Sequence, residues 1–128
     1  MTDPGPHLVL AVVPDLFFAT RIASTAKGSG VTFELVPPQR AAERAGEAQA
    51  WLILIDLHTA DAVALVGALK AAAPHTPLVG FYSHVETELR HDALAAGADA
   101  ALPRSAFTVK LHDLLTWGMA ALSSKEQE

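Results

Sequence analysis

Six side chains that could take part in chemistry follow apolar stretches of the sequence, each near the point where a strand would end. They are Asp15, Asp56, His58, Ser83, His84 and Arg104. Carboxylates and imidazoles together form common ligand sets for metal ions, and imidazole also serves in acid–base chemistry. Such a site needs three or four convergent ligands, and the spacing here does not by itself align them. A small flavodoxin-like enzyme or metal-binding protein is therefore one alternative hypothesis.

The apolar stretches that precede these residues predict five strands. The run over residues 51–55 is uninterrupted and ends at Asp56, which is typical of a strand buried on both faces of a parallel sheet. The other predicted strands cover residues 7–13, 31–36, 78–82 and 99–103. Open α/β sheets bind ligands at the carboxyl ends of their strands, so we expect Asp56 to lie at a functional edge.

Helical patterns alternate with these strands. The predicted helices cover residues 16–27, 39–50, 61–73, 83–96 and 106–122, and Ser83 and Glu86 have the spacing of a capping box. Parallel strands require crossover connections, and helices can then cover both faces of the sheet. The sequence therefore predicts one α/β domain over residues 1–128, a doubly wound five-stranded parallel sheet with five helices, with flexible ends at 1–6 and 123–128.

The composition narrows the classes of function. The 128 residues include no cysteine, which excludes disulfides, thiolate metal sites and cysteine nucleophiles. The net charge is −5 without a basic run, so we expect no nucleic-acid partner. No apolar run reaches the roughly 20 residues of a membrane span, and the first residues lack the features of a signal peptide. We expect a cytoplasmic protein with no membrane contact.

Over essentially its whole length the sequence resembles the receiver domain of bacterial response regulators, the CheY-like family. The resemblance rests on Val13-Pro14-Asp15 at a strand end, Asp56 closing the third strand, Ser83 after the fourth, and Ala96-Gly97-Ala98-Asp99 leading into a strand that ends at Arg104. It implies a flavodoxin-like sheet with strand order 2-1-3-4-5 and a role in two-component signalling rather than catalysis.

The resemblance also implies roles for single residues. Asp56 would be the phosphoacceptor of a histidine kinase, and Ser83 and Arg104 would contact the phosphoryl group. Asp15, Asp56 and the backbone carbonyl of His58 would hold Mg²⁺, which prefers oxygen ligands.

Several positions depart from the receiver pattern, and they concentrate at this site. Pro14 replaces the first residue of an acidic pair, which should weaken Mg²⁺ binding. Arg104 replaces a lysine, although a planar guanidinium and a compact ammonium are not equivalent. Ala101 stands in place of an aromatic switch residue, and His84 replaces a small residue that controls access to the acceptor. Together with Ser105, where proline is usual, these departures predict a pseudo-receiver with a partly degenerate site.

Simpler roles remain open for the same residues. Asp15 could cap the first helix, Asp56 could satisfy a turn, and Ser83 could be a cap alone. Arg104 could pair with Asp15 or Asp56, which would fill the site with an internal salt bridge and keep the domain in one state.

The leading hypothesis is a standalone receiver-like signalling domain that acts by protein–protein interaction. In receivers the fourth helix, fifth strand and fifth helix form the interaction face, which here would offer Arg90, His91, Leu94, Ala101 and Trp117. Exposed tryptophan is common at binding hot spots. The expected partner is a histidine kinase, an output protein, or a second copy bound through the last two helices. A working Mg²⁺-dependent phosphoreceiver, modified on Asp56, is the alternative.

Overall fold

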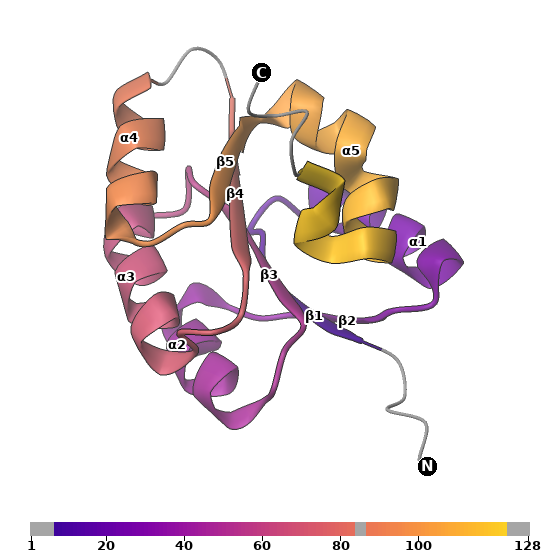
Figure 1. Ribbon diagram of the computed structural model, residues 1–128, viewed down its shortest axis with the longest axis horizontal. Helices are drawn as coiled ribbons and strands as arrows, with labels where there is room; N and C mark the ends of the chain where they lie inside the picture. Colours follow the sequence, from indigo (N-terminus) through magenta and orange to yellow (C-terminus); the bar gives the residue numbers. More distant parts are fainter. Residues whose placement is uncertain (1–6, 84–86, 123–128) are drawn as a thin grey trace.

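The computed structural model describes residues 7–83 and 87–122, in which strands and helices alternate (Figure 1). The strands are β1 (Leu8–Val12), β2 (Thr32–Leu35), β3 (Leu52–Asp56), β4 (Leu78–Tyr82) and β5 (Ala100–Pro103). The helices are α1 (Leu16–Ser29), α2 (Pro38–Glu47), α3 (Ala62–Ala72), α4 (Thr87–Ala96) and α5 (Arg104–Trp117), and a 3₁₀ turn, η1 (Gly118–Leu122), follows α5. None of the described helices is long and apolar enough to cross a membrane.

All five strands belong to one parallel sheet in the order β2-β1-β3-β4-β5. This arrangement confirms the predicted fold class and strand order. The chain leaves the centre of the sheet toward β2 first and then crosses to β3, so the direction of winding changes between β1 and β3. In doubly wound folds this switch point opens a crevice at the carboxyl ends of the strands.

Helices cover both faces of the sheet, with α2, α3 and α4 on one side and α1 and α5 on the other (Figure 1). Successive strand side chains point to opposite faces, and each face has its own buried cluster. On the α1/α5 side the cluster includes Ile22, Leu52, Leu54, Phe81 and Phe107. On the other side it includes Leu10, Ile53, Ile55, Val66 and Leu69. Burial on both faces explains why β1 and β3 read as unbroken apolar runs.

The ends of several helices differ from the predicted boundaries. The last helix was predicted to reach residue 122, but α5 ends at Trp117 because Gly118 adopts a positive φ of 64° and the chain tightens into η1. The fourth helix is described from Thr87 onward, and most of the predicted capping box, His84 to Glu86, lies outside the described residues. Gly30, with φ of 76°, closes α1 as a left-handed C-terminal cap.

Candidate functional site

The candidate site lies at the carboxyl edge of the sheet, meaning the end at which β1, β3, β4 and β5 all stop. Because these strands are parallel and adjacent in the sheet, the residues that close or follow them come to the same edge. These residues are Asp15, Asp56, Ser83 and Arg104. Hydrogen bonds join them in two pairs, Arg104 with Asp15 and, through His58, Asp56 with Ser83.

Asp15 has two structural tasks at this edge. It is the N-cap of α1, and its Oδ1 accepts hydrogen bonds from the backbone N–H groups of Phe17 at 3.0 Å and Phe18 at 3.3 Å. Its other oxygen, Oδ2, lies 3.3 Å from an Arg104 guanidinium nitrogen. The Phe18 N–H, followed by the Arg104 side chain, lowers the pKa of the Asp15 carboxyl below its ordinary value. Asp15 is therefore an ionised group with both oxygens engaged.

Arg104 is held in place from two directions. One guanidinium nitrogen meets Asp15, and the guanidinium carbon lies 3.9 Å from the centre of the Phe18 ring, a cation–π arrangement. Phe18 packs in turn against Phe81 and Phe107, whose rings stack at 4.5 Å between centroids. A planar guanidinium suits this combination of ion pair and ring stacking better than an ammonium does. Arg104 thus belongs to the junction between α1 and α5.

Asp56 has a different environment. It closes β3, is half-buried, and its Oδ1 accepts a hydrogen bond from the backbone N–H of His58 at 2.9 Å. The contact is an Asx-type turn, in which an aspartate side chain bonds the backbone two residues later. Within the described residues no cationic side chain contacts the Asp56 carboxylate.

His58 connects this turn to the end of β4. Its ring nitrogen Nε2 accepts a hydrogen bond from the backbone N–H of Ser83 at 2.9 Å. In this contact Nε2 is the acceptor, which leaves Nδ1 as the ring nitrogen that can donate. The sequence placed Ser83 and His58 at one edge but gave no sign that the imidazole, rather than the carbonyl alone, would be engaged.

The described side chains at this edge do not form a metal site of three or more ligands by themselves. Over residues 7–83 and 87–122 no group of three or more histidine, aspartate or glutamate side chains is arranged to hold a metal ion. Pro14 contributes no carboxylate, and Asp15 is already committed to Arg104 and the α1 backbone. The metalloenzyme alternative therefore finds no support here, and His84, on which it partly rested, lies outside the described residues.

The predicted partner face is only partly on the surface. Arg90 and His91 are exposed on α4, Leu94 is half-buried, and Trp117 is 66% exposed at the end of α5. Ala101 was expected on this face, and that was wrong: its side chain is only 2% exposed because it packs into the cluster beneath α3 and α4. The Arg90 side chain instead contacts the backbone carbonyl of Ala101 at 3.3 Å.

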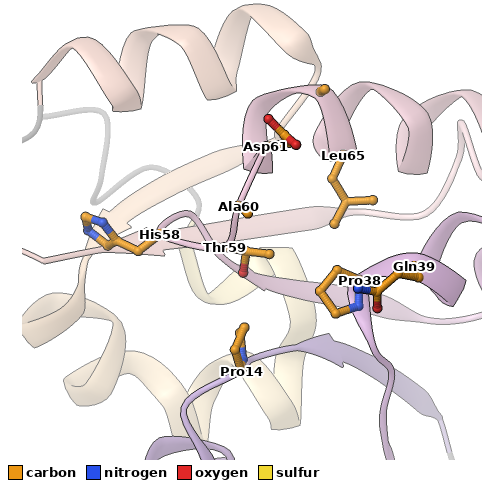
Figure 2. Close-up of a pocket in the computed structure, with 9 residues that line it drawn as sticks. Pro14, Pro38, Gln39, His58, Thr59, Ala60, Asp61 and Leu65 are labelled. Atoms are coloured by element: carbon orange, nitrogen blue, oxygen red, sulfur yellow. The ribbon is translucent and has the colours of Figure 1, made fainter.

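A second feature of the carboxyl edge was not anticipated. A cavity of about 660 Å³ opens between the ends of β1 and β3 and the starts of α2 and α3 (Figure 2). Its lining includes Pro14, Gln39, Thr59 and Asp61. The polar turn after Asp56 was the only sequence signal for it, because a cavity depends on how separate elements meet in space.

The sequence matches no protein-family model and no curated protein. Among solved structures, a CheY-like response regulator receiver domain protein from Methanospirillum hungatei JF-1 is similar with a TM-score of 0.78 and 19% identity, covering 96% of this chain and 98% of that one. A response regulator from Hahella chejuensis has a TM-score of 0.75 and 22% identity, covering 92% and 96% of the two chains.

A third similar structure is a response regulator protein from Burkholderia pseudomallei with a phosphorylated aspartic acid, a calcium ion and citrate. Its TM-score is 0.76 at 18% identity, and the match covers 94% of this chain and 72% of that one. The chain therefore has the CheY-like receiver fold. At these identities the likeness establishes the fold, and the activity has to be argued from the site.

Proposed function

We propose that this chain is a receiver-like signalling domain that works by binding a protein partner, with its phosphorylation site replaced by fixed internal contacts. In this proposal residues 1–128 form one receiver-like unit that acts in the cytoplasm and has no enzymatic activity of its own. The fold supports the signalling class, because structures with the same fold are response regulator receivers.

One observation carries the proposal: the guanidinium of Arg104 is directed to Asp15 and the Phe18 ring, and Asp56 has no cationic neighbour among the described residues. A phosphorylated aspartate needs positive charge close to its phosphoryl oxygens, from a metal or a basic side chain. Recruiting Arg104 would require breaking both of its present contacts. A bound Mg²⁺ would have to share the Asp15 carboxylate with the same arginine.

A second contact supports the proposal independently. The imidazole of His58 bonds the backbone of Ser83 and so bridges the ends of β3 and β4. A receiver that responds to phosphorylation must rearrange the edge at which these strands end. A bridge across that edge opposes rearrangement.

The alternative, a working phosphoreceiver, keeps one favourable observation. Asp56 lies half-buried at the carboxyl end of the central strand β3, and among the described residues only its Oδ1 accepts a hydrogen bond. A small phosphodonor could therefore reach the second oxygen. A phosphorylation assay decides between a degenerate site and a working phosphoreceiver.

The test is incubation with radiolabelled acetyl phosphate and Mg²⁺. We expect no label above that of Asp56→Asn, and we expect label to appear in a chain carrying both Pro14→Asp and Arg104→Lys, which supplies the missing carboxylate and frees Asp15. Stoichiometric labelling of the unaltered chain that disappears in Asp56→Asn would establish the phosphoreceiver instead.

The partner surface is tested separately. Trp117 is the large exposed aromatic side chain near the end of α5, and Val109 on the same helix is 81% exposed. We expect Trp117→Ser to weaken binding of a captured partner, or self-association measured by sedimentation, while Thr116→Ser, at the neighbouring exposed position, leaves both unchanged. Equal binding by the two variants would show that the end of α5 is not part of the partner surface.

A further inference from the structure

The cavity beside Thr59 lies at the switch point of the sheet, between the ends of β1 and β3 (Figure 2). Its volume of about 660 Å³ falls within the range of ligand pockets in proteins. Pro14, Pro38, Ala64 and Leu65 supply apolar walls from three separate parts of the chain, the β1–α1 loop, the start of α2 and α3. The position and size are those of a binding site for a small organic molecule.

Thr59 is an unusual component of this lining. Its side chain is more than nine-tenths buried, and its Oγ1 has no hydrogen-bond partner among the described residues. Figure 2 shows the hydroxyl oxygen on the side of Thr59 that faces Pro14, another residue of the lining. A buried hydroxyl without a partner costs about 1–3 kcal/mol, so it marks a position where a ligand group would complete the structure.

Asp61 is the second polar component. Its backbone is left-handed, with φ of 56° and ψ of 35°, the one positive φ of a non-glycine residue in the described chain. Although Asp61 is the N-cap of α3, its carboxylate makes no capping hydrogen bond, and no ion pair involving it is found among the described residues. An aspartate in this conformation is tolerated but strained, and such residues cluster at binding sites.

The charges around the cavity indicate what it would bind. Asp61 is the only acidic residue of the lining. His58, which also lines the cavity, is already engaged through Nε2 by the backbone N–H of Ser83. No lysine or arginine lines the cavity, which disfavours phosphates and carboxylates as ligands. Gln39 and Thr59 add neutral hydrogen-bonding groups.

We propose that this cavity binds a small amphipathic cation, with an apolar body between Pro14, Pro38 and Leu65 and a cationic hydrogen-bond donor directed to Asp61 and Thr59. The cavity adjoins the phosphoacceptor position through Pro14 and His58, but Asp56 itself is not among its lining residues. The proposed site is a ligand-responsive element in a domain whose receiver edge is otherwise occupied by internal contacts.

The test is an NMR titration of the isotope-labelled full chain with benzamidine, a flat apolar cation, and with benzoate as the oppositely charged control. We expect saturable benzamidine shifts confined to backbone amides around Thr59, Ala60, Ala64 and Leu65, with a millimolar Kd typical of a fragment. Benzoate should produce no saturable shift at these amides.

Three variants locate the site. Ala64→Trp fills the cavity and should weaken benzamidine binding at least about tenfold, whereas Ala68→Trp, at another exposed alanine of α3 outside the lining, should leave it unchanged. Asp61→Asn keeps a residue that tolerates the left-handed backbone and should weaken binding about threefold. Thr59→Val is nearly isosteric, removes an unpaired buried hydroxyl and should fold, with binding weakened about threefold.

The result that overturns the proposal is equally specific. Unsaturable or dispersed shifts, an equal response to benzoate, or unchanged binding in Ala64→Trp would each show that the cavity is not a site for amphipathic cations. Folding of every variant is checked in the same spectra, so a loss of binding in an unfolded protein cannot count as support.

Discussion

Asp15 and Asp56, at the same carboxyl edge of the sheet, make different contacts. Asp15 bonds two backbone N–H groups and a guanidinium, whereas Asp56 bonds one backbone N–H and meets no cation among the described residues. The sequence allowed both roles of Asp15, as a helix cap and as the partner of Arg104, because its position after a strand and before a helix is visible in the chain. The choice of Arg104 between the two aspartates was not visible, since it depends on the Phe18 ring beneath the guanidinium.

The lowered pKa of Asp15 gives a prediction about acid stability. A carboxyl whose pKa is lower in the folded than in the unfolded protein contributes stability above its unfolded value, near pH 4, and loses that contribution as the pH falls through the folded value. Asp15→Asn should therefore show a smaller loss of stability between pH 7 and pH 3 in urea unfolding. Asparagine is an equally good N-cap, so the difference at low pH reports the charge.

Glu34 provides the comparison for that experiment. Its pKa is also lowered, chiefly by the hydrogen bond from Arg44, so Glu34→Gln should reduce the acid sensitivity in the same direction. The effects of the two substitutions should add, because the two sites share no contact partner. An unchanged acid profile in Asp15→Asn would mean that the contacts with the Phe18 N–H and Arg104 do not lower the pKa of Asp15 in solution.

At the scale of elements, the end of α1 depends on one glycine. Gly30 has φ of 76°, in the left-handed region, whereas Gly28 lies within the helix with open space around it. Gly30→Ala should destabilise the protein by about 1 kcal/mol, and Gly28→Ala should stabilise it by about 0.5 kcal/mol. Thermal unfolding of both variants measures the difference, and a stabilising Gly30→Ala would contradict the cap.

The packing of β4 against the segment after β3 depends on another glycine. A Cβ atom at Gly80 would lie 2.9 Å from three side-chain carbons of Leu57, which is itself buried. Gly80→Ala should therefore cost about 1–3 kcal/mol through overpacking. Gly67→Ala on α3, where no atom lies within 4 Å, is the control and should be neutral or stabilising in urea unfolding.

The elements were largely predictable because their apolar periodicity is strong. All five strands and five helices overlap the segments that the sequence predicted. The second helix, however, ends at Glu47 and not at residue 50, and the last turn of the final helix was wrong. Leu122 continues the apolar spacing of α5, so the pattern extended through Gly118, and only the positive φ of that glycine ends the helix. The spacing of apolar residues predicts which side chains are buried. It does not predict a change of backbone geometry at a residue between two buried positions.

At the scale of the whole molecule, Asp99 links separate elements. Its Oδ2 accepts hydrogen bonds from the Leu78 backbone N–H at 2.8 Å and from Lys70 Nζ at 3.0 Å, joining the start of β4, the turn before β5 and the end of α3. Asp99→Ala should cost about 2 kcal/mol because it leaves a backbone donor and an ammonium without this partner. Asp92→Ala, at an exposed position on α4, should change urea unfolding by less than about 0.5 kcal/mol; equal effects would contradict the linking role.

The topology itself followed from the resemblance to receivers, while the polar turn after Asp56 was not enough to predict the cavity. Alternating strands and helices required a parallel sheet, but physical reasoning alone left the strand order open. The cavity needs Pro14, Pro38 and Leu65 to meet around Thr59, and these residues come from three different parts of the chain. A site whose residues come from separate parts of the chain leaves no recognisable pattern in any one stretch of the sequence.

The strand order also determines which strand edges are unpaired while the protein is being synthesised. Once residues up to Asp56 have left the ribosome, β3 can pair with β1. The opposite edge of β3 stays unpaired until β4, Leu78–Tyr82, has been translated. During that interval a strand that is apolar except for Asp56 presents unpaired N–H and C=O groups to neighbouring nascent chains, the geometry that promotes aggregation. The yield of soluble protein in cells should therefore depend on how quickly the codons for α3 are read.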